Sequence, residues 1–277
     1  MKFHSILVAG LLALCAVAPT ASLAQDWQTP CVAAPYDYSY ADDTRQVVIN
    51  RYQSNGVTYF VADVQISDPH DLRAVIAREN GGDSRQALTD IVSDQNTVLA
   101  INGDDYGTHR YGTIIRNGQP LRAAQTTRNM LIVDSNGDFS VRIDRKNEKP
   151  KQLSADLMDA GTWQTFEFGP ALIENGQKLE FSRVFDLIST KSSRREPRTA
   201  IGQIDVLHYA VIVADGRQDG YSIGMTLPEL QDIFLSLGAK TAINLDGGGS
   251  TEMWFNGQII NRPSGGAERK ITDIICF

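Results

Sequence analysis

Five of the chain's Asn-Gly pairs stand between short apolar segments, and this spacing limits the folds open to the chain more than any other feature. The pairs stand at 55–56, 117–118, 136–137, 175–176 and 256–257. Asn-Gly favours the left-handed backbone of two-residue hairpin turns, so we expect many antiparallel strands. The clearest predicted hairpins pair 46–52 with 57–66, 129–133 with 139–143, and 253–255 with 258–260.

Two segments have the spacing of helices instead. Between 84 and 94 the apolar residues recur at helical intervals, and an apolar strand at 97–101 follows. The second helix begins at 226–229, a capping-box pattern with proline in its first turn, and is followed by a strand at 241–245. The pattern therefore predicts an α+β (mixed α/β) fold. We expect mixed, largely antiparallel sheets, a few packed helices and a loop-rich active site at one sheet edge.

The first 24 residues have the layout of a cleavable secretory signal. Lys2 precedes an apolar run from 6 to 18, and the small residues Ser22 and Ala24 stand before Gln25. That run is too short to span a bilayer core of roughly 30 Å, so we expect cleavage near Ala24 rather than a membrane anchor. The mature protein is expected to be exported, to the periplasm or to the medium.

The rest of the chain is long enough for one large domain. Residues 25–44 contain Pro and Asp without sustained periodicity, and we interpret them as an N-terminal arm before a catalytic domain at 45–277. The full chain carries 33 acidic against 26 basic residues, a formal net charge of −7. This charge excludes bulk attraction to nucleic acid or to an anionic membrane. The sequence leaves the oligomeric state open.

Two cysteines remain once Cys15 leaves with the signal. Cys31 lies near the mature start and Cys276 one residue from the end. A single remaining pair in an exported protein favours a disulfide, which would close nearly the whole chain into one loop. Two free thiols are the alternative. Metal binding by the pair is not expected, because no His or Cys stands at ligand spacing beside either cysteine.

A short motif occurs twice, each time where a predicted strand ends in a polar loop. Ala-Ile-Asn stands at 100–102 and again at 242–244, and an acidic residue follows two positions later as Asp104 and Asp246. If the two units pack side by side, both loops open at the same edge of the sheet. Ligands of α/β proteins tend to bind at such an edge.

The second loop, residues 244–251, contains three successive glycines and is called the glycine-rich loop below. Glycines let the backbone adopt positive φ and bring its amides close to a ligand, which suits an anion. The loop is not a Walker A motif, because no Lys follows the glycines. Nor is it a nucleophile elbow, because Glu252 replaces the final glycine. A tight structural turn is the alternative.

Four motifs follow one another in a defined order. They are Pro-Arg-Thr-Ala-Ile-Gly at 197–202, Asp-Gly-Arg at 215–217, Gly-Met-Thr-Leu-Pro-Glu-Leu at 224–230 and Asn-Leu-Asp-Gly-Gly-Gly-Ser-Thr at 244–251. This order resembles the phosphodiester glycosidase family, which includes the lysosomal uncovering enzyme that removes N-acetylglucosamine from mannose-6-phosphate diesters. The likeness is close over 197–269 and looser over 99–118. There the family often has aromatic residues after the first Asn-Gly, whereas this chain has Asp104 and Asp105.

The resemblance implies hydrolysis of a sugar-1-phosphodiester. We assign Asp246 to the anomeric carbon or the attacking water, because a carboxylate stabilises the positive charge that develops there. Arg198 and the amides of the glycine-rich loop would hold the phosphate, and Asp104 would act as a second carboxylate or a ligand. The predicted substrate-binding residues are Asn102, Gly103, Thr199, Asp215, Arg217, Asn244, Gly247, Gly248, Gly249, Ser250 and Thr251.

A structural role is the alternative for several of these residues. Asp246 could form an Asx turn, Arg198 an ion pair, and Ser250 a helical cap. Asn102 and Asn244 could instead pair with backbone groups of the loops.

Two other functions stay open beside hydrolysis of a sugar-1-phosphodiester. One is a glycosidase that acts on a non-phosphorylated exopolysaccharide, and the other is a module that binds a phosphorylated glycan without turnover. No cofactor is predicted, but a divalent cation beside Asp104, Asp105 and Asp246 stays open.

Overall fold

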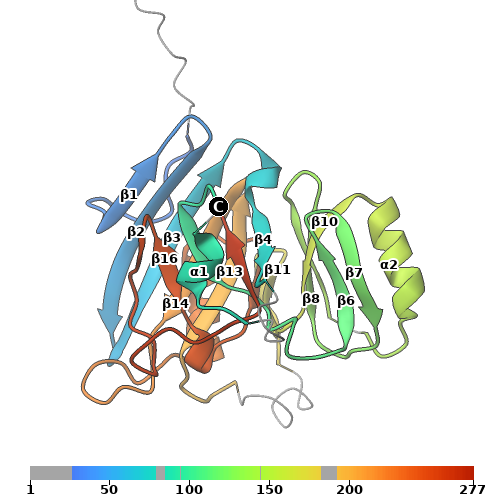
Figure 1. Ribbon diagram of the computed structural model, residues 1–277. Helices are drawn as coiled ribbons and strands as arrows, with labels where there is room; N and C mark the ends of the chain where they lie inside the picture. Colours follow the sequence, from blue (N-terminus) through green and yellow to red (C-terminus); the bar gives the residue numbers. More distant parts are fainter. Residues whose placement is uncertain (1–26, 79–84, 94, 144, 182–191) are drawn as a thin grey trace, which may run out of the picture.

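The computed structural model describes residues 27–78, 85–93, 95–143, 145–181 and 192–277 (Figure 1). The predicted signal at 1–24 and its cleavage point lie outside these residues. Every strand pair in the described ranges is antiparallel, and three α-helices accompany the sheets. The α+β prediction is confirmed. No helix among these residues is long and apolar enough to cross a membrane.

An eight-stranded sheet is the largest element. In spatial order its strands are β1 (Tyr38–Ala41), β2 (Arg45–Ser54), β3 (Val57–Ile66), β14 (His208–Ala214), β13 (Arg198–Asp205), β15 (Thr241–Asn244), β11 (Ala171–Glu174) and β12 (Gln177–Lys178). Strand β1 belongs to the segment that the sequence predicted to be an irregular arm. It has only four residues, too few for a sequence pattern, and pairing with β2 holds it in place.

A five-stranded sheet packs against one face of the large sheet. Its order is β17 (Gln258–Ile259), β16 (Met253–Phe255), β5 (Leu99–Asn102), β18 (Asp273–Cys276) and β4 (Arg73–Ile76). Phe60, Val211 and Ile243 of the large sheet share one buried cluster with Ile101 and Ile275 of the smaller sheet. The two sheets therefore form a sandwich, with this main core between them.

Two small sheets and a helix form a side lobe, drawn at the right of Figure 1. The sheets are β10 (Thr162–Phe166), β8 (Met130–Asp134) and β9 (Phe139–Arg142), and the hairpin β6 (Gly112–Arg116) with β7 (Gln119–Ala124). Helix α2 (Pro150–Asp159) packs on them through Leu153 and Leu157, which contact Ile115 and Met130. The sequence did not predict this helix, because few of its residues are apolar.

Helices cover the outer faces of the sandwich. Helix α4 (Leu227–Ser236) lies on the large sheet through Leu230 and Phe234, and the predicted capping box at Thr226 and Glu229 is present. Helix α1 (Leu88–Val92) lies on the five-stranded sheet and is shorter than the predicted 84–94, whose end residues lie outside the described ranges. Both helices keep the apolar stripe that predicted them.

The three predicted hairpins are confirmed as β2–β3, β8–β9 and β16–β17. At four of the five Asn-Gly pairs both residues have positive φ, as the turn requires; at 136–137 only the glycine does.

The predicted disulfide between Cys31 and Cys276 is wrong. Both thiols are free. Cys31 packs on the outer face of the eight-stranded sheet, whereas Cys276 belongs to the cluster on the outer face of the five-stranded sheet. Both sheets and the core between them separate the two residues, so their Cα atoms cannot come within the roughly 7 Å that a disulfide needs.

Candidate functional site

The two Ala-Ile-Asn loops meet at one end of the sandwich. Strand β5 delivers the first loop from the small sheet and β15 delivers the second from the large sheet, so they are not neighbours in one sheet. The backbone N–H of Asp246 donates to Gly103 O at 3.3 Å, and Asn102 Nδ2 donates to Asp246 O at 2.7 Å. The loops meet because the two sheets pack face to face, and not because β5 and β15 pair within one sheet.

Asn102 joins three segments of the chain. Its Oδ1 accepts from Thr199 Oγ1 at 2.7 Å and from the backbone N–H of Glu252 at 3.2 Å, while its Nδ2 holds the Asp246 carbonyl. These hydrogen bonds use most of the donors and acceptors of the Asn102 side-chain amide. Asn102 and Thr199, both predicted to bind substrate, are therefore placed as supports of the site.

A polar cleft opens beside this junction. Its lining residues are Arg85, Asn102, Gly103, Asp105, Thr108, Asp246, Ser250, Arg269, Lys270, Ile271, Thr272 and Asp273. Four of them were predicted to be site residues: Asn102, Gly103, Asp246 and Ser250. The cleft combines three basic with three acidic side chains, which suits a ligand with both an anionic group and hydroxyls.

Asp246 is the lining carboxylate that the glycine-rich loop supplies. Its Oδ1 accepts from the backbone N–H of Gly247 at 2.8 Å. Burial raises the pKa of Asp246 to about 6; the Asp105 charge also raises it, and the Ser250 hydroxyl and Arg269 act in the opposite direction. No salt bridge within 4 Å reaches Asp246 from the described residues. The carboxylate thus stays available to a ligand and titrates near neutral pH.

The glycines allow close packing of the loop. Gly248 has φ +62°, and a Cβ on Gly247 would lie 2.7 Å from Pro197 O. The amides of Gly247, Gly248 and Ser250 donate to Asp246 Oδ1, Pro197 O and Gly247 O. The predicted phosphate cradle therefore gains no support, because these donors already have acceptors within the protein.

Two arginines flank the glycine-rich loop instead. A Cβ on Gly248 would lie 3.0 Å from Arg217 Nη2, and one on Gly249 would lie 3.4 Å from Arg269 Nη1. Arg217 donates from Nε to Glu196 at 2.6 Å. The glycines leave room for both guanidinium groups against the loop, and either group can pair with an anion.

Arg198 lies elsewhere than predicted. It does not line the cleft, and its side chain donates to the carbonyl oxygens of Met225 at 3.1 Å and Arg194 at 2.9 Å. Burial lowers the pKa of Arg198 to about 10. These contacts support a structural role, so contact with phosphate stays a prediction without support from this geometry.

Three further predicted binding residues, Asp215, Asn244 and Thr251, do not line the cleft. The Asp215 carboxylate accepts from Tyr221 at 2.8 Å, Asn261 at 2.9 Å and the backbone of Arg262. Asn244 Nδ2 donates to Gly169 O at 2.9 Å, while its Oδ1 and Thr251 Oγ1 are buried without a hydrogen-bond partner. Their predicted contact with substrate stays untested.

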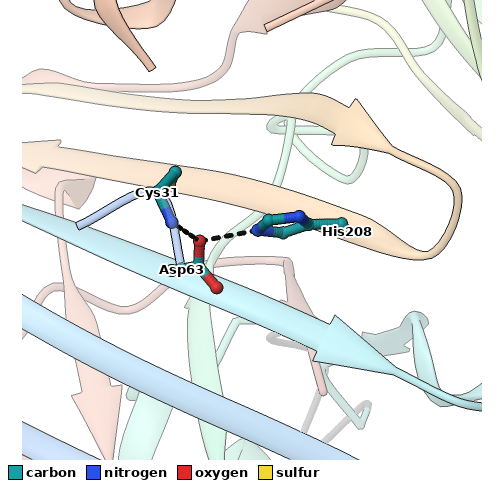
Figure 2. Close-up of side chains that lie close together, drawn as sticks. All are labelled: Cys31, Asp63 and His208. Carbon is teal, nitrogen blue, oxygen red and sulfur yellow. Dashed lines mark hydrogen bonds and ion pairs between the residues drawn. The ribbon is translucent and has the colours of Figure 1, made fainter. Parts of the chain in front are cut away.

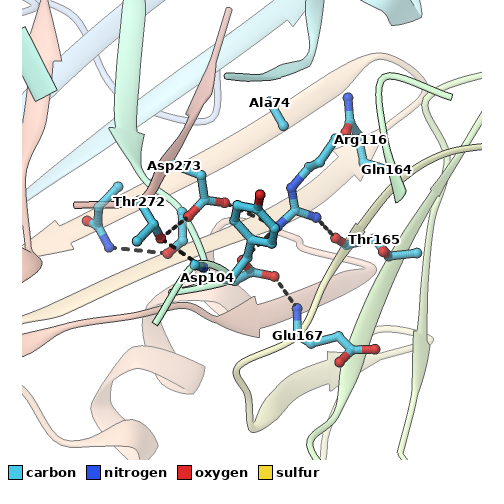
Figure 3. A network of polar contacts seen from close by, with 12 residues as sticks. Ala74, Asp104, Arg116, Gln164, Thr165, Glu167, Thr272 and Asp273 are labelled. Atoms are coloured by element: carbon cyan, nitrogen blue, oxygen red, sulfur yellow. Dashed lines mark hydrogen bonds and ion pairs between the residues drawn. The ribbon is translucent and has the colours of Figure 1, made fainter. Parts of the chain in front are cut away.

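Asp104 belongs to a buried ionic network rather than to the cleft (Figure 3). Arg116 Nη2 lies 2.6 Å from Asp104 Oδ1 and 3.1 Å from Asp273 Oδ2, and all three side chains are at most 2% exposed. The other oxygen of Asp104 accepts from the backbone N–H of Glu167 at 2.6 Å. Burial, followed by the charge of Asp104, raises the pKa of Asp273 to about 7. The network therefore anchors the first loop to the side lobe.

A family model described as phosphodiester glycosidase matches residues 95–277. The chain belongs to the phosphodiester glycosidase family. The matched segment contains both polar loops, the two flanking arginines and the whole cleft apart from Arg85.

Three proteins that are similar to this chain have sequence identities of 28% or less. The SPbeta prophage-derived uncharacterized protein YomE of Bacillus subtilis (strain 168) is 28% identical over 204 residues; the match covers 70% of this chain and 30% of YomE. The zebrafish N-acetylglucosamine-1-phosphodiester alpha-N-acetylglucosaminidase catalytic domain, auto-inhibited by its pro-peptide, is 18% identical with TM-score 0.66, over 84% of this chain and 82% of that chain. A hypothetical protein from Synechocystis is 17% identical with TM-score 0.55, over 84% and 62%. The two structures share the fold.

Sequence reasoning missed four of the six charged residues that line this family member's cleft, namely Arg85 and three residues near the start of β18. Arg269, Lys270 and Asp273 come from the segment that leads into β18, after the last predicted motif. The run Glu268-Arg269-Lys270 soon after Gly265-Gly266 was the available signal. Only the folded chain shows that this run returns to the glycine-rich loop.

Proposed function

We propose that this phosphodiester glycosidase hydrolyses a sugar-1-phosphodiester of the N-acetylglucosamine-1-phosphodiester kind. Water would attack the anomeric carbon, the bond from that carbon to the phosphate oxygen would break, and the products would be free sugar and a phosphomonoester. The substrate class is taken from the name of the zebrafish relative. Export of the chain, to the periplasm or the medium, belongs to the same proposal.

The Asp246 carboxylate carries this proposal, because it lines the cleft without a salt bridge from the described residues, and Arg217 and Arg269 lie against the same loop. In its ionised form, Asp246 would stabilise positive charge at the anomeric carbon or accept a proton from the attacking water. A pKa of about 6 leaves most of this group ionised at neutral pH while keeping it basic enough for proton transfer. Asn102 supports this position by holding the Asp246 backbone.

Arg217 and Arg269 would neutralise the phosphate. The phosphate of a diester leaves as a weak base, so charge neutralisation helps its departure more than protonation does. Both guanidinium groups lie against the glycine-rich loop that carries Asp246. This arrangement would place the phosphate beside the loop and the sugar toward Asp246.

The test compares two substrates of the full chain, a synthetic N-acetylglucosamine-1-phosphodiester and an aryl N-acetylglucosaminide. Removing one charge-assisted contact to phosphate corresponds to a loss of about 10- to 100-fold in kcat/KM for the diester. We expect Arg217→Ala and Arg269→Ala each to show that loss, with a much smaller loss on the aryl glycoside. Arg142→Ala is the matched control, because Arg142 is half-exposed and pairs with Glu148 away from the cleft.

Three results would overturn parts of the proposal. Equal losses on both substrates would remove the phosphate role of the arginines. Tight binding of the diester without release of sugar would identify a binding module. Turnover of a non-phosphorylated polysaccharide, with none of the diester, would identify the alternative glycosidase.

A further inference from the structure

A second cluster of functional side chains lies outside the cleft. Cys31, Asp63 and His208 each offer one ligand atom, and these three atoms lie within 4.8 Å of one another. Figure 2 shows the Asp63 carboxylate between the backbone nitrogen of Cys31 and the His208 ring, with a hydrogen bond to each. Asp63 is in β3, and His208 is the first residue of the neighbouring strand β14, two residues before Ala210, which pairs with Asp63. Their side chains therefore share the outer face of the eight-stranded sheet, and Cys31 lies over that face.

We propose that Cys31, Asp63 and His208 form a binding site for one divalent cation of the zinc class, which fastens the segment before β1 to the sheet. A thiolate, a carboxylate oxygen and an imidazole nitrogen are the ligands that Zn²⁺ takes in proteins. Hard cations such as Ca²⁺ and Mg²⁺ prefer oxygen ligands only, so this donor set selects against them. The sequence could not predict the site, because its ligands come from positions 31, 63 and 208.

The surroundings hold the ligands as a metal site requires. His208 Nδ1 lies 3.2 Å from Gln28 Oε1, which leaves Nε2 pointing at Asp63 Oδ2, 2.6 Å away. Gln65 Nε2 donates to the other oxygen of Asp63 at 3.2 Å. Metal-bound histidines usually donate their second nitrogen to such an acceptor, and ligating carboxylates are themselves hydrogen-bonded.

Charge and burial also fit a cation. Asp63 is fully buried and the His208 side chain is 4% exposed, whereas Cys31 is half-buried and leaves a way in from solvent. A thiolate and a carboxylate together balance the charge of one divalent ion, so the occupied site would be neutral. In a tetrahedral zinc site the ligand atoms lie roughly 3–4 Å apart. Small side-chain rotations would bring these three atoms to that spacing.

A catalytic cysteine is the competing interpretation, and the geometry opposes it. His208 Nε2 faces Asp63, and burial followed by the Asp63 charge raises the pKa of the Cys31 thiol well above its ordinary value. A reactive cysteine needs a lowered pKa and a base facing its sulfur. The strands of His208 and Asp63 also lie two and three strands from β15, roughly 10 and 14 Å across the sheet from the strand that delivers Asp246. Its expected role is structural.

The experiment uses metal-free full-length protein in a Cys15→Ser background, titrated with Zn²⁺ or with Co²⁺. We expect one equivalent of Zn²⁺ to bind, the melting temperature to rise, and Co²⁺ to give a thiolate-to-cobalt charge-transfer band. Cys31→Ser and His208→Gln should abolish the band and the shift. Gln28→Ala should weaken Zn²⁺ binding by about 10-fold. His70→Gln is the matched control, because His70 pairs with Asp68 on the surface without a thiol.

Protection of the thiol tests the site without any ligand variant, so loss of folding cannot obscure the answer. Zn²⁺ should slow alkylation of Cys31, measured residue by residue by mass spectrometry, at least 10-fold relative to metal-free protein. Unchanged alkylation of Cys31 in the folded protein would overturn the proposal. So would Zn²⁺ binding of equal strength in the folded Cys31→Ser variant.

Discussion

Asp104 and Asp246 follow the same Ala-Ile-Asn motif, yet the structure places them in opposite environments. Asp104 is 1% exposed, and its two oxygens are occupied by Arg116 and the Glu167 backbone. Asp246 lines the cleft without a salt bridge from the described part of the chain. The difference shows that the partner, and not the motif, decides whether a buried carboxylate is structural or available for chemistry.

The largest expected effect is a difference in activity between variants of the two aspartates. Asp246→Asn should lower kcat on the sugar-1-phosphodiester by about 10²- to 10⁴-fold, because it removes the group that transfers a proton or stabilises charge. Asp104→Asn should keep most of the activity per folded molecule. Steady-state kinetics, with circular dichroism to confirm folding, checks both. A folded Asp246→Asn variant with full activity would disprove the assignment, and a folded, inactive Asp104→Asn variant would restore the catalytic role predicted for Asp104.

The next effect concerns stability. Arg116→Met should lower the free energy of unfolding by about 3–5 kcal/mol at neutral pH, because Asp104 and Asp273 would lose their buried cation. Arg142→Met, at a half-exposed ion pair with Glu148, should cost less than about 1 kcal/mol. Urea unfolding measures both. Equal costs for the two variants would contradict the structural interpretation of the network.

The third effect is a pH dependence of the cleft. Since burial raises the pKa of Asp246 to about 6 and the ionised form is proposed to act, kcat/KM should fall about tenfold per pH unit below pH 6. The acid limb of a pH–rate profile measures this. Activity that rises as the pH falls through 6 would instead assign Asp246 as a general acid.

The smallest effect extends the comparison to Glu252, whose Oε2 is buried and has no hydrogen-bond partner among the described residues. Burial raises its pKa to about 7, so the folded state binds more protons than the unfolded state and stability falls as pH rises from about 4 to 7. Glu252→Gln should therefore gain about 1–2 kcal/mol at pH 8 and nothing near pH 4. Urea unfolding at both pH values measures this gain in the free energy of unfolding. Glu180→Gln is the control, because Glu180 is exposed. An equal gain at both pH values would rule out ionisation as the cause.

Local features of the sequence predicted local structure well. The Asn-Gly pairs located the hairpins, and the capping box located α4, because turns and caps depend on neighbouring residues. The motif order led to Asp246, which lines the cleft, while its role in catalysis stays a prediction. The surroundings of individual side chains were harder to predict. Arg198 donates to carbonyl oxygens, and Arg116 neutralises Asp104. Cys31 lies beside Asp63 rather than beside Cys276. Each of these depends on how distant segments stack.

Strand β18 pairs with two strands that are made much earlier during synthesis. It lies between β5 and β4, so an interior strand of the five-stranded sheet is supplied by residues more than 170 positions after both of its neighbours. Asp273, which shares Arg116 with Asp104, arrives on the same strand. During synthesis, Arg116 lacks its second carboxylate until Asp273 has been added, more than 150 residues later. Pairing between segments so far apart in the sequence favours slow folding.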